Sequence, residues 1–99
     1  MNATPSIALS GMQAAQWRLH AGAHNVANLA TEGLRRQEVQ QTTQAQGGVT
    51  TEVVRATAAG PDLVQDLVDQ LQARNAFLAN LAVFKTSDKL AGALLDIRA

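Results

Sequence analysis

The sequence contains no cysteine and no tyrosine, and it has only one tryptophan and two phenylalanines among 99 residues. Without cysteine the chain has no disulfide framework, no thiolate nucleophile and no cysteine-based zinc site. Aromatic residues make up 3% of the chain although 46% of it is hydrophobic, so the apolar content is mostly Ala, Leu and Val. This composition favours helices packed along seams over a sandwich of sheets with a thick core.

The chain also lacks an excess of charge of either sign, because eight basic residues balance eight acidic ones. A balanced chain has no field that would attract nucleic acid or an anionic bilayer, so we expect neither as a partner. No apolar run approaches the roughly 18–20 residues that a membrane helix needs, which predicts no integral membrane segment. The N-terminus lacks the basic start and apolar run of a cleaved secretory signal, so any export is expected to use another route.

A first helix is predicted from Pro5 to about Thr31. Thr4 can cap the free amides of its first turn, and proline at the first helical position loses no hydrogen bond. Gly33 suits the left-handed conformation that ends many helices. The apolar positions recur every three or four residues and form one stripe: Leu9, Met12, Leu19, Ala23, Val26 and Ala30.

A second row on the same helix consists of small residues spaced by seven: Ala8, Ala15 and Gly22. Small side chains let another backbone come close. We therefore expect two contact faces on this helix, with the leucine stripe as the main one and the row of small residues as the second.

The middle of the chain, residues 34–60, changes to Gln, Thr and Val around the adjacent glycines Gly47 and Gly48. Alternating β-branched residues beside a Gly-Gly pair predict a hairpin of about Glu38–Gln44 against Val49–Thr57. The alternative is a mobile loop, because the segment is rich in glutamine and poor in apolar residues.

A second and longer helix is predicted in the last third of the chain. Asp62 and Gln65 have the spacing of a capping box. Asp66 and Asp69 follow in the first turns, where we expect exposed carboxylates that stabilise the helix dipole. The apolar stripe then continues to the end of the pattern: Val64, Leu67, Leu71, Leu78, Leu81, Phe84, Ala91, Leu94, Leu95 and Ile97.

Together these patterns predict a mainly α fold that forms one structural domain. Two long terminal helices are expected to pair as an antiparallel-type coiled coil, with a short β-hairpin or loop between them. The three segments are residues 1–33, 34–60 and 61–99. Helices of about 40 Å and 54 Å are longer than a small domain requires. We therefore expect the excess length either to be covered by other chains or to stay exposed.

Short motifs lie at both ends of the chain in a fixed order. Near the N-terminus they comprise Ser10, Gly11 and Met12, followed by Asn25, Val26, Ala27, Asn28, Thr31 and Gly33. Near the C-terminus they lie in residues 72–80, 84–90 and 94–97 and include Asn80, Lys85, Thr86 and Asp88. This arrangement resembles the bacterial flagellar axial proteins, the rod and hook subunits, and is most similar to their proximal-rod branch. Leu34 stands where that family usually carries an aromatic residue.

The resemblance implies a structural subunit of the flagellar basal-body rod that supports motility. It implies export through the flagellar type III apparatus without a cleaved signal, and self-assembly with copies of itself and with other rod and hook subunits. The alternative function is a cytoplasmic helical adaptor that binds axial subunits or export components. The expected assembly interface is Leu9, Met12, Leu19, Val26, Leu67, Leu71, Leu78, Leu81, Leu94 and Leu95.

An enzyme is not expected, because the sequence has no nucleophile with a nearby base and no phosphate-binding glycine loop. We therefore predict no cofactor and no small-molecule substrate. His20 and His24 lie four residues apart and would share a helix face, as zinc ligands can. No cysteine or suitably placed carboxylate completes such a site, so no metal is predicted.

Other polar and aromatic residues have simple structural interpretations. Trp17 lies off the main stripe and is either an interface anchor or packed on the chain's own hairpin. Asn25, Asn28 and Thr31 are expected to hydrogen-bond local backbone near the helix end. Arg35 and Arg36 are expected to lie in a solvated turn, and the alternative is a pair with an acidic residue of a neighbouring subunit.

Overall fold

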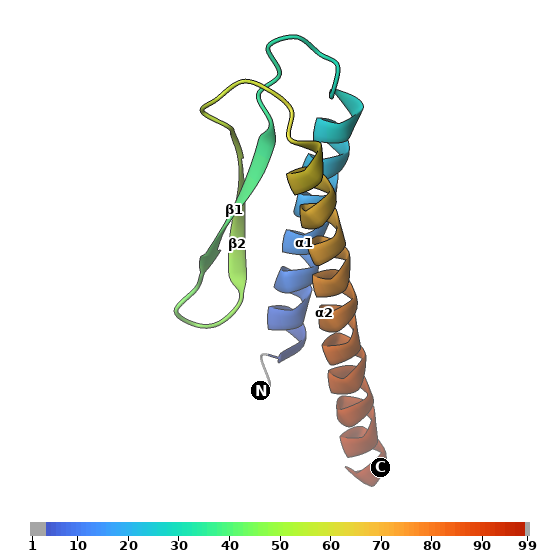
Figure 1. The fold of residues 1–99 in the computed structure, drawn as a ribbon. Helices are drawn as coiled ribbons and strands as arrows, with labels where there is room; N and C mark the ends of the chain where they lie inside the picture. Colours follow the sequence, from blue (N-terminus) through green and yellow to red (C-terminus); the bar gives the residue numbers. More distant parts are fainter. Residues whose placement is uncertain (1–3, 99) are drawn as a thin grey trace.

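The structure is a computed structural model that describes residues 4–98. Residues 1–3 and 99, which belong to the predicted terminal segments, lie outside the described residues. The described chain forms four elements: α1 (Thr4–Ala27), β1 (Gln37–Thr43), β2 (Val49–Arg55) and α2 (Leu63–Arg98). The two helices lie side by side, and the hairpin packs beside α1 (Figure 1). The expected mainly α fold with paired terminal helices is confirmed, and the middle segment is a hairpin rather than a loop.

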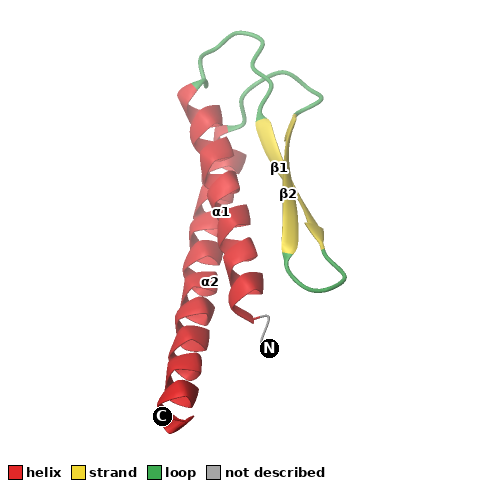
Figure 2. Cartoon of the chain, turned by 180° about the vertical axis from the view of Figure 1, so that it is seen from behind, coloured by secondary structure: helices red, strands yellow, loops and turns green. Residues whose placement is uncertain are grey.

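The molecule is long and thin, with Cα extents of 62 × 24 × 14 Å. α1 has 24 residues and α2 has 36, so the helices measure about 36 Å and 54 Å. Asn25 faces Asp66 and Gly11 faces Asn80, so the helices are antiparallel, and this register brings Thr4 about level with residue 87. The C-terminal end of α2 therefore extends past the start of α1 (Figures 1 and 2).

Small residues on α1, rather than its leucines, form the face that pairs with α2. Ala8 and Ala15 are buried, at 3% and 1% exposed. A Cβ atom added to Gly22 would lie 2.7 Å from Cγ of Gln70 on α2. The expectation that the leucine stripe is the main contact face was therefore wrong within the chain, because the close approach of the helices selects residues by size rather than by hydrophobicity.

Short side chains also form the matching face of α2. Its positions spaced by seven are Asp66, Ala73, Asn80 and Ser87, of which Ala73 is 0% exposed. A repeat of seven keeps one side of a helix turned toward an antiparallel neighbour over its whole length. The helix pair is therefore a coiled coil whose seam consists of alanine, glycine and small polar residues.

The ends of the helices depend on side chains that bond to the backbone. Asp62 caps α2, because its Oδ1 accepts a hydrogen bond of 3.1 Å from the N–H of Gln65. At the end of α1, Asn28 donates its side-chain N–H to the carbonyl of His24 at 2.8 Å. The chain then continues in turns, so α1 ends at Ala27 and not near Thr31 as predicted.

The hairpin pairs Gln37 with Arg55 and Thr43 with Val49, close to the predicted strands. Gly47 and Gly48 have φ values of 96° and 84° in the connecting turn, which other residues rarely adopt. A Cβ atom on Gly47 would lie 2.7 Å from Cδ1 of Ile7. The turn therefore needs glycine for its conformation, and its tip lies against Ile7 of α1.

Among the described residues, the buried apolar side chains are few and small. Five are alanines, and the largest is Leu34, which is 7% exposed. Leu34 accepts a hydrogen bond of 2.7 Å from the N–H of Gly60, which brings together the two chain segments that lead into and out of the hairpin. Among residues 4–98, neither helix has an apolar stretch that would let it cross a membrane.

Candidate functional site

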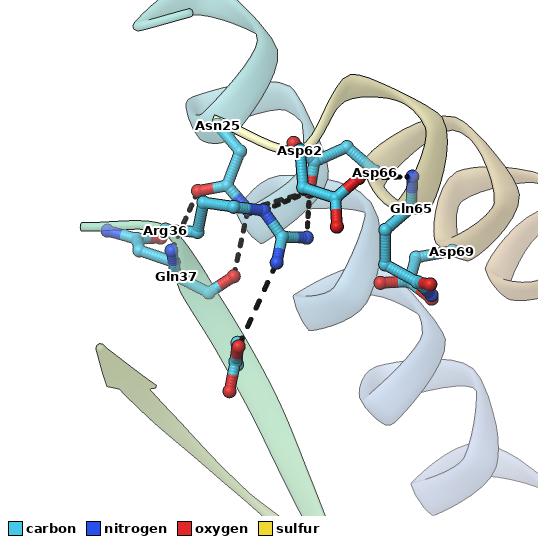
Figure 3. A network of polar contacts seen from close by, with 8 residues as sticks. Asn25, Arg36, Gln37, Asp62, Gln65, Asp66 and Asp69 are labelled. Carbon is cyan, nitrogen blue, oxygen red and sulfur yellow. Dashed lines mark hydrogen bonds and ion pairs between the residues drawn. The ribbon is translucent and has the colours of Figure 1, made fainter. Parts of the chain in front are cut away.

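A group of polar residues, which we call the polar junction, joins α1, the hairpin and α2 at one end of the molecule (Figure 3). It consists of Asn25, Arg36, Gln37 and Asp66. Asn25 accepts a hydrogen bond of 2.7 Å from the N–H of Gln37 and donates one of 2.9 Å to its carbonyl. A side-chain amide here replaces the neighbouring strand that β1 would otherwise need at this position.

Asp66 is the centre of the polar junction. Its Oδ1 accepts hydrogen bonds from Nδ2 of Asn25 at 3.2 Å and from Nε of Arg36 at 3.0 Å, and it also accepts one from Nη2 of Arg36. Asp66 is 1% exposed, and its Oδ2 has no hydrogen-bond partner among the described residues. The polar junction therefore contains one buried acceptor oxygen that receives no hydrogen bond from residues 4–98.

The sequence-based expectations for Asp66 and Arg36 were wrong. Asp66 was expected to be an exposed carboxylate and Arg36 to lie in a solvated turn, but both side chains are buried. The reason is that the chain before β1 returns along the start of α2 and places Arg36 against it. Nothing within ten residues of either position signals a contact between residues 30 apart in sequence.

The electrostatics of the polar junction favour the charged form of Arg36. The pKa of Arg36 is raised, chiefly because its side chain donates hydrogen bonds to Asp66, and burial opposes this effect. Because the pKa of Arg36 is raised in the folded chain, its ion pair with Asp66 stabilises the fold at every pH below the ordinary pKa of arginine. This stabilisation is lost only as the pH rises through the raised pKa. The guanidinium therefore stays charged at any pH near neutrality.

The residues of the N-terminal motif make internal contacts. A Cβ atom on Gly11 would lie 2.7 Å from the side chain of Asn80, so the N-terminal and C-terminal motifs meet across the helix pair. Ser10 Oγ accepts a hydrogen bond of 3.2 Å from the N–H of Val49 and so ties the hairpin to α1. Asn25 contributes to the polar junction, which is less local than expected.

The remaining residues of the two motifs have local roles or face outward. Thr31 donates a side-chain hydrogen bond of 3.3 Å to Oδ1 of Asn28, and not to the local backbone as expected. Gly33 has a φ value of 70°, the predicted left-handed conformation, although it lies six residues beyond the end of α1. Thr86 donates to the carbonyl of Ala82 at 2.9 Å, whereas Lys85 and Asp88 are exposed on α2.

The predicted assembly residues lie mostly on the outside of the helix pair. Six leucines are exposed by between 43% and 68%: Leu9, Leu67, Leu71, Leu78, Leu94 and Leu95. Four others are half-buried: Met12, Leu19, Val26 and Leu81. Five of the six exposed leucines lie on α2 and Leu9 lies on α1. Large exposed apolar surfaces commonly mark contacts with other chains, so these faces are candidates for such contacts.

Trp17 is 50% exposed on α1, where its ring lies edge-on to that of His20 with the ring centroids 6.4 Å apart. This position favours an interface anchor over packing on the hairpin. Within the described part of the chain, His20 and His24 have no third His, Asp or Glu close enough to form a metal site with them.

Replacement of Ser10 by alanine is expected to loosen the tip of the hairpin, because the N–H of Val49 then loses its acceptor. A lost hydrogen bond of this kind costs about 1 kcal/mol. Amide hydrogen exchange of Val49 should become roughly fivefold faster, while exchange of Val54 stays unchanged. Equal acceleration at both amides would contradict a local role for Ser10.

The sequence could have revealed the orientation of Asp66, since this residue lies seven before Ala73 and fourteen before Asn80 on one helix face. The partner of Asp66 has no comparable signal, because Arg36 reaches it only through the path of the hairpin.

No protein-family model matches the chain, and no curated protein is significantly similar to it.

Proposed function

We propose that this chain is a structural subunit of the bacterial flagellar basal-body rod, which assembles with copies of itself and with other axial subunits. The ordered motifs at both ends of the sequence are the basis of this proposal. The mainly helical fold with paired terminal helices is compatible with it. In this function the protein has no catalytic role and takes no cofactor.

One observation carries the proposal. The signature residues Gly11, Asn25 and Asn80 are used inside the chain, where they hold the helices and the hairpin together. The leucines at the predicted interface are instead exposed. A subunit that stabilises itself with small and polar residues keeps its large apolar side chains for contacts with its neighbours.

The shape of the chain supports repeated assembly. α2 extends past the start of α1, and Leu94 and Leu95 on this extension are 62% and 68% exposed. A contact between the extended end of one copy and the side of the next is heterologous, and such contacts continue into filaments unless they close into a ring. A rod is an assembly of this kind.

The test is deletion of the coding sequence in the bacterium that carries it, followed by complementation with a tagged copy. We expect loss of motility, rods that do not reach completion, and recovery of the tagged protein in purified basal bodies. A cytoplasmic adaptor, the alternative function, would leave the tagged protein in the cytosol. Normal motility after deletion would contradict both functions.

Replacement of Leu71 and Leu78 by glutamine should abolish self-association and leave the fold intact. Each leucine contributes about 1.5–3 kcal/mol when it is fully buried at a contact, so the pair should raise the dissociation constant at least 100-fold. Sedimentation velocity across a concentration series measures this change, with circular dichroism as the check on helix content. Ala79→Gln, an exposed change on another side of α2, is the matched control. Unchanged sedimentation of the double variant would contradict the proposed interface.

A further inference from the structure

A groove runs along β1, between this strand and the helix pair. It consists of two cavities of about 480 Å³ and 370 Å³, and both are lined by Arg18 of α1 and Gln41 of β1. Residues of α2 form the far wall, including Asp69 in the first cavity and Asn80 in the second. Among the described residues, no Cα atom of β1 lies within 8 Å of one in α2. We call this space the β1 groove.

The strand edge that faces the β1 groove is unpaired along most of its length. The carbonyl of Arg36 accepts a hydrogen bond from Ala56, and the N–H of Gln44 donates one to Gly48, so even-numbered residues of β1 point their backbone groups at β2. Odd-numbered residues then point theirs away from β2. At Gln37 both groups are bonded by Asn25, which lines the first cavity.

The next three odd-numbered residues have no such partner. Among the described residues, the outward N–H and C=O groups of Val39, Gln41 and Thr43 have no hydrogen-bond partner. A free edge of this kind accepts an added strand, and natural proteins usually protect it with proline, lysine or a bulge. The strand sequence contains neither proline nor lysine and pairs with β2 in continuous register.

The charges of the β1 groove define the kind of segment that fits. Three carboxylates line the first cavity, those of Glu38, Asp66 and Asp69, against the two guanidinium groups of Arg18 and Arg36. Arg36 pairs with Asp66 and lies 3.8 Å from Glu38, whereas Asp69 is hydrogen-bonded only to the neutral side chain of Gln65 among the described residues. This end of the groove therefore favours a hydrogen-bond donor with positive charge.

We propose that the β1 groove binds an extended peptide segment of another protein, which adds to β1 as a third strand and places a lysine or arginine beside Asp69. Backbone hydrogen bonds to Val39, Gln41 and Thr43 hold the segment, and the basic side chain fixes its register. This inference uses none of the exposed leucines and does not depend on the proposed rod function. A rod subunit and a cytoplasmic adaptor would both be able to use the site.

The probe is the capped heptapeptide Thr-Val-Thr-Lys-Thr-Val-Thr, titrated into the full-length protein and followed by NMR. We expect chemical-shift changes along β1 and at least tenfold slower amide exchange at Val39, Gln41 and Thr43. The same peptide with an N-methyl group on every residue has no backbone N–H to donate along either edge and should not bind. A peptide with glutamine in place of lysine should bind about fivefold more weakly.

Two proline variants identify the edge. Gln41→Pro removes an outward N–H of β1, and Thr51→Pro removes an outward N–H of β2 at the position that pairs with Gln41. Neither N–H contributes to the bonds between the strands, so both hairpins should persist, because proline is tolerated on such an edge. We expect Gln41→Pro to weaken binding at least tenfold and Thr51→Pro to leave it unchanged.

Several results would overturn the proposal. These are binding of the N-methylated peptide, equal weakening by both proline variants, or no shift changes at millimolar peptide. Slow exchange of the three amides that appears without peptide as the protein concentration rises would assign the edge to a second copy of the chain. Equal binding of the lysine and glutamine peptides would refute the placement of a basic residue beside Asp69.

Discussion

Replacement of Asp66 by alanine is expected to lower the free energy of unfolding by about 3–5 kcal/mol, because the buried guanidinium of Arg36 loses its hydrogen-bonded partner and keeps only the ion pair with Glu38 at 3.8 Å. The side chain of Arg36 is only 11% exposed and donates two hydrogen bonds to Asp66. Asn25 loses an acceptor at the same time. Urea denaturation followed by circular dichroism measures the change.

The effect should be specific to the buried carboxylate. Asp69→Ala removes a half-buried carboxylate on the same helix turn, whose hydrogen bond is to Gln65, and should change stability by less than about 0.5–1 kcal/mol. The double variant Arg36→Met/Asp66→Leu should be more stable than Asp66→Ala alone, since it removes both charges. Equal losses for the two single aspartate variants would contradict the central role of Asp66.

The helices, their caps and the hairpin could be predicted from the sequence because each depends on local signals. Asp62 caps α2 where its spacing to Gln65 indicates, and the Gly47-Gly48 pair lies in the turn between the strands. These features involve residues within a few positions of one another. Propensity, capping and turn conformation are sufficient to define them.

The contacts between the elements were harder to predict. Leu9 and Leu19 are more hydrophobic than Ala15 and Gly22, yet the helices pair through the smaller residues. Hydrophobicity measures the gain from burial, but it does not reveal how closely two backbones approach. The polar junction is still less accessible to prediction, since it depends on a path of about 30 residues from Arg36 to Asp66.

The use of small residues where the helices meet also explains why the inner and outer surfaces of the molecule differ. Small and polar residues form the internal contacts, so the apolar core is small and many leucines are exposed. A chain with such a small core is expected to have modest stability on its own. Any contact that covers the leucines would therefore add to the stability of the chain.

Replacement of Ala73 by leucine is expected to lower the free energy of unfolding by about 1–3 kcal/mol, although it adds an apolar side chain to a helix. Ala73 is 0% exposed and lies on the face of α2 that packs against α1. The register set by Asn25–Asp66 and Gly11–Asn80 places Ala73 between the levels of Ala15 and Gly22, which are already small and cannot shrink to make room. The helices must move apart or the new side chain must adopt a strained rotamer.

Ala79→Leu provides the control, because it makes the same chemical change at an exposed position of α2 and should shift stability by less than about 0.5 kcal/mol. Separation of the helices should also weaken the hydrogen bond from Asn25 to Asp66, which lies one heptad from Ala73. Amide exchange of Gln37, whose N–H is held by Asn25, should then accelerate in Ala73→Leu and not in Ala79→Leu. An Ala73→Leu variant as stable as the original chain would show that the helices pair less closely than their small residues indicate.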